Sequence, residues 1–357
     1  MRYYKDRTGL FYYDNIHPSV VHETKAALVV RAGSCVENKN ERGLAHLIEH
    51  MNAIGISFLH IRVKYAYTQF NETVYFFDHQ TIDEMDCSLF AAYCEQTARS
   101  ILAGDYLTEE TFSQARSEVI REYHRTDMRK LDAIRELFRP DGYDLRLPIG
   151  DLDTINRFGL SDAFCFHNRW YSPKNAAFIV ASGTENKKTE QSKINSNYIF
   201  LISKLKRDVG IFERYIEESV CLHIALDAIR IASAPFGNIN VSTEIFLPGW
   251  HLIHLRVETD KFILSKEDLT INIKNLYIND QILAKAKQSF AERVNKYPTD
   301  FGLIDINDIL QECIMHFLYG EPMVDVEEER KKALFYLDRI VLDEINDVIK
   351  KIIKEMK

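Results

Sequence analysis

Hydrophobic positions along the chain switch between the alternation typical of strands and the spacing typical of helices, and this switching begins again past the middle. The strand-like stretches of the first half are Leu10–Ile16, Ala26–Ala32, Ala66–Phe77 and Ala176–Ala181. The helical stretches are Asn40–Gly55, Asp83–Ala103, a helix that follows the N-cap candidate Thr108 and continues toward Phe138, and Asp162–Trp170. The first half therefore mixes strands and helices.

Residues 182–197 hold almost no large apolar side chain and indicate an exposed connection, although a surface loop within one domain has the same composition. Beyond it we predict strands at Tyr198–Ile202, Asn238–Phe246 and Trp250–Val257, and helices at Glu213–Ile231, Asp280–Val294, Ile306–Tyr319, Val324–Phe335 and Asp343–Glu355. A chain of 357 residues exceeds the usual size of one domain. We predict domains at residues 1–185 and 198–357, joined by a linker at 186–197.

Composition and charge argue against several classes of protein. A hydrophobic content of 46% can form substantial cores, while a net charge of −8 without a clustered basic stripe argues against nucleic-acid binding. The first residues lack the apolar region of a secretion signal, and no stretch has the ~18 consecutive apolar residues of a membrane span. The six cysteines form no C-x-x-C pair, which argues against a cysteine zinc site and for reduced thiols. We expect a cytoplasmic protein without a membrane span.

Residues 41–50, which read ERGLAHLIEH, contain the densest candidate chemistry. At roughly 100° per residue, His46, Glu49 and His50 share one helix face, and the apolar residues of the helix lie nearly opposite. Imidazoles at i and i+4 can bind one zinc ion, and the glutamate is then placed to act as general base. The order H-x-x-E-H inverts the commoner H-E-x-x-H zinc-protease motif. The alternative is a solvated helix face with incidental histidines.

The surroundings of this motif resemble the pitrilysin/insulinase family of zinc peptidases (family M16). The landmarks are the strand Ala26–Ala32 running into Gly33-Ser34, Glu37, Gly43, the stretches 65–68 and 72–77, Leu147-Pro148-Ile149-Gly150, and residues 169–183. The resemblance is specific over about residues 8–185 and rests mainly on element order beyond that. It implies an α+β fold of two consecutive related α/β-sandwich domains, each an antiparallel-rich sheet flanked by helices, which together form one half of a clamshell.

The resemblance also implies a third zinc ligand, a glutamate on a later helix. Aligning Phe112 with the family pattern F-x-x-E-x-x-x-V-x-x-E-E places Glu122 at the ligand position. The family usually carries another glutamate one heptad earlier, where this chain has Ala115. Glu118, one turn before Glu122, is the candidate for that supporting carboxylate, and it is also the alternative ligand.

Family members bind peptides along an exposed strand edge near the zinc, and the matching residues here are Ala66, Tyr67 and Thr68. Tyr65 replaces an asparagine of the family pattern, so one polar contact to the substrate is in doubt. The aromatic residues of this region are candidates for side-chain pockets or, alternatively, for core packing.

The resemblance implies a zinc-dependent endopeptidase that cleaves short or unfolded peptides, such as precursor or leader peptides. Many family members carry an Arg and a Tyr in their second half, but residues 225–246 contain Arg230 without that pattern. We therefore expect a related partner subunit to supply the pair, with a homodimer as the alternative assembly. One alternative is a non-catalytic scaffold that binds peptides. The other is a metal-dependent hydrolase with a non-peptide substrate, for which the sequence offers no phosphate loop or nucleophile elbow.

Overall fold

The chain folds into two compact units, each described here by itself. The computed structural model describes residues 2–16, 23–56, 61–79, 87–126, 128–142, 146–183, 198–206, 212–247, 250–258, 265–298 and 304–356. The first unit comprises residues 1–127, 145–186 and 300–318, and the second comprises 128–144, 187–299 and 319–357. The predicted linker at 186–197 lies outside the described residues, so the predicted domain boundaries stay predictions.

A six-stranded sheet forms the centre of the first unit. Its strands are β1 (Arg2–Lys5), β2 (Phe11–Asn15), β3 (Glu23–Val30), β4 (Ile61–Thr68), β5 (Thr73–His79) and β6 (Ala176–Gly183), in the order β1-β2-β6-β3-β5-β4. Only β2 and β6 pair in parallel, so the sheet is rich in antiparallel pairs, as predicted. The single strand-like stretch predicted at Ala66–Phe77 is wrong, because a turn separates β4 from β5. Gln69 and Glu72 close that turn through their backbone.

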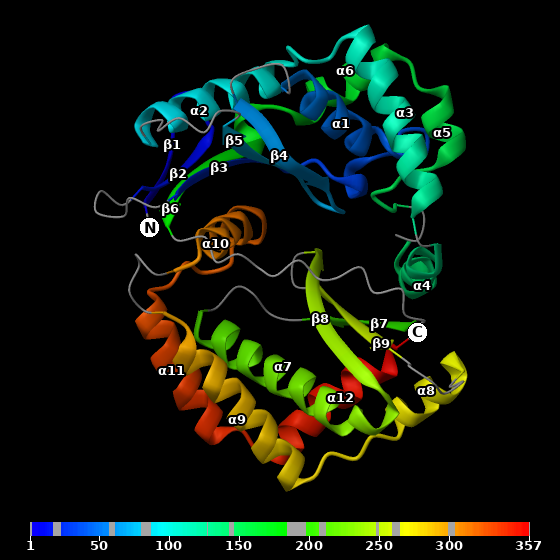
Figure 1. The fold of residues 1–357 in the computed structure, drawn as a ribbon, viewed down its shortest axis with the longest axis vertical. Coiled ribbons are helices and arrows are strands. Elements are labelled where there is room, and N and C mark those ends of the chain that lie inside the picture. Colours follow the sequence, from blue (N-terminus) through cyan, green and yellow to red (C-terminus); the bar gives the residue numbers. More distant parts are fainter. Residues whose placement is uncertain are drawn as a thin grey trace. The chain divides into compact units, whose positions relative to one another are not determined.

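Helices cover both faces of this sheet. The helices are α1 (Leu44–Ile56), α2 (Cys87–Ala103), α3 (Glu109–Arg125), α5 (Leu152–Arg157), α6 (Leu160–Trp170) and α10 (Ile306–Tyr319). Figure 1 shows α1 and α2 on one side of the sheet and α10 on the other. Strand β2 explains the arrangement, since successive side chains point to opposite faces. Tyr13 hydrogen-bonds to His316 of α10, whereas Tyr12 packs on the opposite face against Phe178.

Helix α3 begins as predicted but ends earlier. Thr108 is its N-cap, and its side chain accepts a hydrogen bond from the backbone N–H of Thr111. The prediction that this helix continues toward Phe138 is wrong. Thr126 adopts an extended conformation with ψ of 139°, and a separate helix, α4 (Met128–Phe138), follows.

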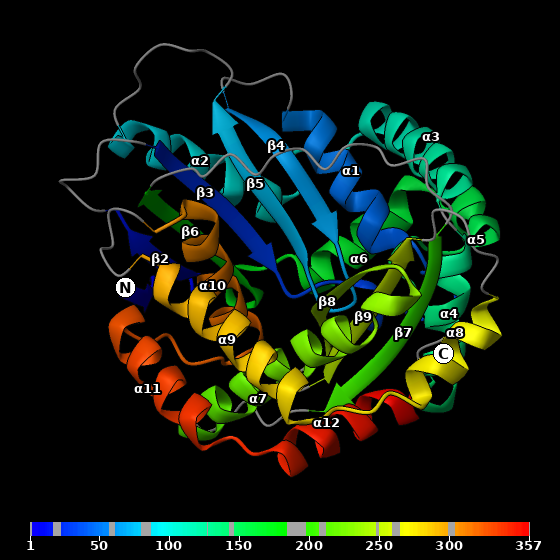
Figure 2. The same cartoon turned by 60° about the horizontal axis from the view of Figure 1, so that its bottom comes forward.

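The second unit repeats the order of elements in the first. Its strands β7 (Tyr198–Lys206), β8 (Asn238–Leu247) and β9 (Trp250–Glu258) form an antiparallel sheet in the order β7-β9-β8. Its helices, besides α4, are α7 (Phe212–Ala232), α8 (Lys266–Lys274), α9 (Asp280–Lys296), α11 (Val326–Arg339) and α12 (Leu342–Lys354). Figure 2 shows α7 and α9 beside one another. The succession β7-α7-β8-β9-α8-α9 matches β3-α1-β4-β5-α2-α3, and the sheet orders β7-β9-β8 and β3-β5-β4 agree.

Each unit has its own hydrophobic core. In the first unit, Leu28, Val30 and Tyr75 of the sheet pack with Leu47 and Ile48 of α1. In the second, α7 contributes Ile224, Ala225 and Ile229. Among the described residues, none of the helices combines the length and the apolar content needed to cross a membrane.

Helix α1 begins at Leu44 rather than near Asn40, and a buried carboxylate explains the difference. Glu37 is 3% exposed and accepts hydrogen bonds from the backbone N–H groups of Gly43, at 3.0 Å, and Ala45, at 2.8 Å. These are donors that the first turn of a helix leaves unpaired. Gly43 has a φ of +100°, a conformation that side chains disfavour, so the chain turns there before the helix starts.

Removing this cap should loosen the start of α1. We expect Glu37→Ala to lower the free energy of local opening by about 1–3 kcal/mol, since two buried N–H groups lose their acceptor. Hydrogen exchange of the α1 amides measures this, with Glu110→Ala, an exposed position in the first turn of α3, as control. Unchanged exchange of the α1 amides in Glu37→Ala would show that the carboxylate is not a cap.

Candidate metal centre

Three side chains of α1 predicted from the sequence lie together on the helix. His46 and Glu49 are 7% and 6% exposed, and His50 is half-buried. Leu47 and Ile48 are fully buried in the core of the first unit. The helix is therefore fixed by its apolar side while the polar side chains face α3 and β4, with which α1 is in contact.

Helix α3 brings Glu122 to the two histidines. Its Oε2 lies 3.4 Å from His46 Nε2 and 3.3 Å from His50 Nε2, and the two Nε2 atoms are 3.2 Å apart. Among the described residues, these three form the group that could hold a metal ion. The glutamate is half-exposed, so the site has a side open to solvent.

The donor triangle fits a tetrahedral zinc ion. Ligands at ~2.0–2.1 Å from a tetrahedral centre lie roughly 3.3–3.4 Å from one another, which is close to the three separations found here. Two imidazoles and one carboxylate are also a ligand set that catalytic zinc uses, with a fourth position left free. The fit thus rests on both the distances and the chemistry of the donors.

Glu118 lies behind His50 rather than in the triangle. Its Oε2 is 3.3 Å from His50 Nδ1, so this nitrogen can donate its proton to the carboxylate. That contact keeps the proton on Nδ1 and leaves Nε2 with the lone pair that a metal needs. In this geometry Glu118 lies where it could support His50, and Glu122 lies where it could serve as a ligand.

Glu49 is held by hydroxyl groups of the sheet. Thr68, the last residue of β4, donates to Glu49 Oε2 at 2.9 Å, and its Oγ1 lies 3.2 Å from that of Thr73 on β5. Thr73 in turn donates to the backbone carbonyl of Ala32 at 2.7 Å. Thr68, predicted as a substrate contact, touches the candidate base, and its contact with a substrate stays a prediction.

The charges of the site act on one another. Burial raises the pKa of Glu49, although His46, His50 and the Thr68 hydrogen bond act against this. Burial alone would lower the pKa of His50, but hydrogen bonds to Glu122 and Glu118 and the charge of Glu49 outweigh it, and the pKa is raised. Hydrogen bonds from both histidines hold the pKa of Glu122 well below its usual range.

The other predicted contacts, Ala66 and Tyr67, lie on β4. This strand is at the edge of the sheet within the described residues, paired only with β5. Tyr65 is exposed and stacks on Phe76 at 4.5 Å between ring centroids, so this part of the aromatic set lines the strand surface. Tyr75 belongs to the core.

Sequence reasoning missed several residues that support the site. Glu37 was noted only as a landmark, and the roles of Thr73 and Asn52 had no local signal. Asn52 is fully buried and donates to the hydroxyl of Tyr75, which also contacts the hydroxyl of Tyr171 at 2.9 Å. These bonds tie α1 to the sheet and to the end of α6.

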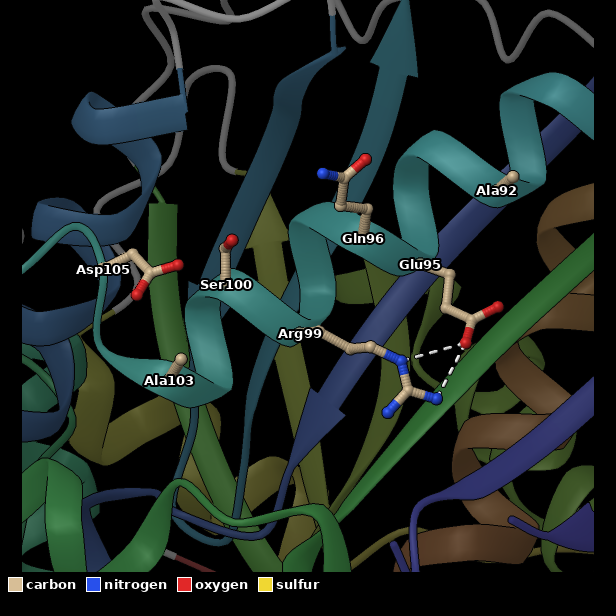
Figure 3. Close-up of a pocket in the computed structure, with 7 residues that line it drawn as sticks. All are labelled: Ala92, Glu95, Gln96, Arg99, Ser100, Ala103 and Asp105. Atoms are coloured by element: carbon tan, nitrogen blue, oxygen red, sulfur yellow. Dashed lines mark hydrogen bonds and ion pairs between the residues drawn. The ribbon is translucent and has the colours of Figure 1, made fainter. Parts of the chain in front are cut away.

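A separate hollow of about 430 Å³ lies along the outer face of α2. Figure 3 shows Arg99 reaching Glu95 there, while Gln96 and Ser100 project from another side of the same helix. Arg99 also pairs with Asp6, at 2.7 Å, so one guanidinium bridges two carboxylates. The hollow contains none of the metal-site residues.

Comparison with known proteins agrees with the geometry. Residues 16–144 match the family model described as insulinase (peptidase family M16). The predicted family resemblance is confirmed. A probable zinc protease, PqqL of Escherichia coli (strain K12), is 25% identical over 209 residues, which are 50% of this chain and 21% of that protein. The chloroplastic stromal processing peptidase of Arabidopsis thaliana is 25% identical over 178 residues, 45% of this chain and 14% of that protein.

The fold has a solved counterpart. The crystal structure of the first half of the periplasmic protease PqqL from Escherichia coli aligns with a TM-score of 0.71 at 17% identity, covering 99% of this chain and 90% of that one. The predicted fold class is confirmed. The matched segments span about a fifth or less of the length of the two curated relatives. Since M16 relatives are zinc proteases, Zn²⁺ is the expected cofactor.

Glu118 and Glu122 of α3 should differ in their effect on zinc binding. Glu122→Gln removes a ligand and should abolish stoichiometric binding, whereas Glu118→Gln should weaken it by roughly 10–100-fold by releasing His50. Competition with a chromophoric chelator measures both affinities, and Glu110→Gln on the same helix should leave them unchanged. Retention of zinc by Glu122→Gln together with its loss in Glu118→Gln would exchange the two roles.

Zinc affinity should rise as the pH rises through the raised pKa of His50. Below that pKa the imidazole is protonated and paired with Glu122, and it must lose its proton before it can bind a metal. Calorimetry in two buffers of different ionisation enthalpy should show about one proton released per zinc on the acidic side and fewer above. An affinity that does not change between about pH 5 and 8 would contradict this coupling.

Proposed function

We propose that this chain is a zinc-dependent endopeptidase of the inverted H-x-x-E-H type that cleaves short or unfolded peptides. The observation that carries the proposal is the triangle of His46, His50 and Glu122. Glu49 lies beside it, on the helix that carries the two histidines. Zinc proteases among the relatives support the same reading. When bound, zinc would supply a Lewis acid that polarises the scissile carbonyl and lowers the pKa of water.

The residues of the chain perform the proton transfers in this proposal. Glu49 takes the proton of the attacking water and later passes it to the leaving amine. Its raised pKa brings the carboxyl closer to neutral pH, where a group can both accept and donate a proton. Thr68 holds one carboxylate oxygen, which leaves the other for the water. The edge of β4, at Ala66 and Tyr67, accommodates the peptide backbone as an added strand.

The proposal includes a partner. Arg230, the arginine of the region where family members carry an Arg/Tyr pair, is paired with Asp227 in the second unit. In this proposal a related chain supplies those groups, with a homodimer as the alternative assembly, and precursor or leader peptides are suitable substrates for such a pair. The match to one half of PqqL supports this partnership. The cytoplasmic location stays a prediction from the sequence.

A non-catalytic peptide-binding scaffold is the second candidate, favoured by Ala115 at a usual glutamate position and by Tyr65. The two candidates differ in what Glu49 does. A scaffold needs no base, whereas a peptidase loses turnover without one.

We expect Glu49→Gln to abolish cleavage of dye-quenched unfolded peptides while it retains zinc, because the ligands are intact. Thr68→Val should lower kcat by about tenfold with little change in KM, since it removes one hydrogen bond to the charged base. The zinc-loaded chain is assayed over a range of concentrations to detect a requirement for a second copy, and Glu110→Gln is the matched control. Equal cleavage by wild type and Glu49→Gln would overturn the peptidase, and zinc binding without cleavage at any concentration would favour the scaffold.

A further inference from the structure

The second unit contains a counterpart of the metal site in which the ligands have been replaced. Helices α3 and α9 align from their N-caps, Thr108 and Asn279. Their buried residues then coincide, Phe112, Ala115 and Val119 in α3 with Leu283, Ala286 and Phe290 in α9. In this alignment, Arg293 occupies the position of Glu122, and Ser289 occupies that of Glu118.

Helix α7 supplies the other side, as α1 does in the first unit. His223 and Asp227 are separated by four positions, like His46 and His50. Asp227 Oδ2 lies 2.7 Å from Arg293 Nη1, where the first unit has the contact between His50 and Glu122. The ion pair of Asp227 and Arg293 thus lies where the first unit has its candidate metal donors. The positive charge at this place is the guanidinium of Arg293.

A cavity of about 640 Å³ opens at this place between α7, β8 and α9. Its charged lining residues are Arg230, Arg293 and Lys296 against Asp227 and Glu292, an excess of one positive charge. The cavity belongs to the second unit alone. Its net charge suits an anionic ligand.

Contacts with neighbouring side chains hold Arg230 and Arg293 in place. Asp227 is 7% exposed, and its two oxygens pair separately with Arg230 Nη2, at 2.9 Å, and Arg293 Nη1. Ser289 Oγ accepts from both guanidinium groups, at 3.4 Å and 3.0 Å. Each guanidinium has five donors, so these contacts use only part of them, and both side chains remain about half exposed. The donors are oriented before any ligand arrives.

The strand that borders the cavity favours a peptide over a small free anion. Four consecutive residues, Asn240 to Thr243, line it, although successive side chains of a strand point to opposite faces. A cavity that touches all four must run along the edge of the strand. Within the described residues, β8 is an edge strand paired only with β9, so its outer backbone groups are available to an extended chain.

We propose that this cavity is a binding site for a carboxylate carried by a peptide, with Arg230, Arg293 and Lys296 as its recognition groups. Planar guanidinium groups match a carboxylate in geometry as well as in charge. Both arginines already pair with one carboxylate, that of Asp227. The site goes beyond the proposed peptidase activity and needs no zinc, so zinc-free Glu49→Gln protein can be used to test it separately.

Calorimetric titration with four probes tests this proposal. The probes are an acetylated and amidated hexapeptide containing glutamate, its glutamine analogue, the analogue with a free C-terminal carboxylate, and inorganic phosphate. We expect the amidated glutamine peptide, which carries no carboxylate, to bind at least tenfold more weakly than one or both carboxylate peptides. Which of these two binds tightly shows whether the site recognises a side-chain carboxylate or a C-terminal one. Salt should weaken the carboxylate binding.

Variants locate the binding. Arg230→Gln with Lys296→Gln leaves Arg293 to pair with Asp227 and should weaken carboxylate binding at least tenfold, while Lys285→Gln, on an exposed position of α9, should not. Circular dichroism and the unfolding midpoint verify that each variant folds. Lys296→Gln alone, at an exposed position, should weaken binding roughly threefold and provides a variant in which a folding defect is not expected. Three outcomes would each overturn the proposal. The first is equal binding of all three peptides, the second is binding of phosphate alone, and the third is no binding by folded wild type.

Discussion

Helix α1 packs against α3 and against the edge of the sheet at once, and the candidate metal centre depends on this double contact. Two of the donor atoms come from α1 and the third from α3, so a small shift of one helix past the other would open the triangle of Nε2 and Oε2 atoms. Apolar residues of α1, such as Leu47 and Met51, are fully buried and resist that shift. Hydrophobic packing therefore sets the geometry in which the polar groups operate.

Burying several ionisable groups is costly unless each has a partner. In this site the partners are the ionisable groups themselves, with Glu122 between two histidines and Glu118 behind one of them. Glu49 depends on Thr68 instead. A cation at the centre of the triangle would relieve the close approach of the two Nε2 lone pairs, which is a physical reason for these donors to be kept together.

The residues that the structure brings together could be named from the sequence where local periodicity and family pattern coincide. His46, Glu49 and His50 share a helix face because of their spacing, and the alignment of Phe112 with the family pattern pointed to Glu122. The strand position of Thr68 followed from the sequence, but its hydrogen bond to Glu49 did not, because a contact between a strand and a helix is a tertiary property. Glu37 is six residues from the N–H of Gly43 and had no periodic signal. The division of α3 from α4 depended on the backbone of Thr126, which no propensity marks strongly.

The repetition of elements in the second unit shows how one scaffold can present different polar groups at the same place. A helix pair and an edge strand bring side chains together in both units, and Arg293 stands at the position of Glu122, so a guanidinium lies in the second unit where the first has a candidate metal ligand. The hydroxyl of Thr68 has a consequence of its own. It joins the candidate base to β4, a strand whose outer edge is unpaired within the described residues. In the proposed peptidase, a peptide that adds to that edge would therefore also stiffen the support of Glu49, and docking and proton transfer would be connected through a single oxygen atom.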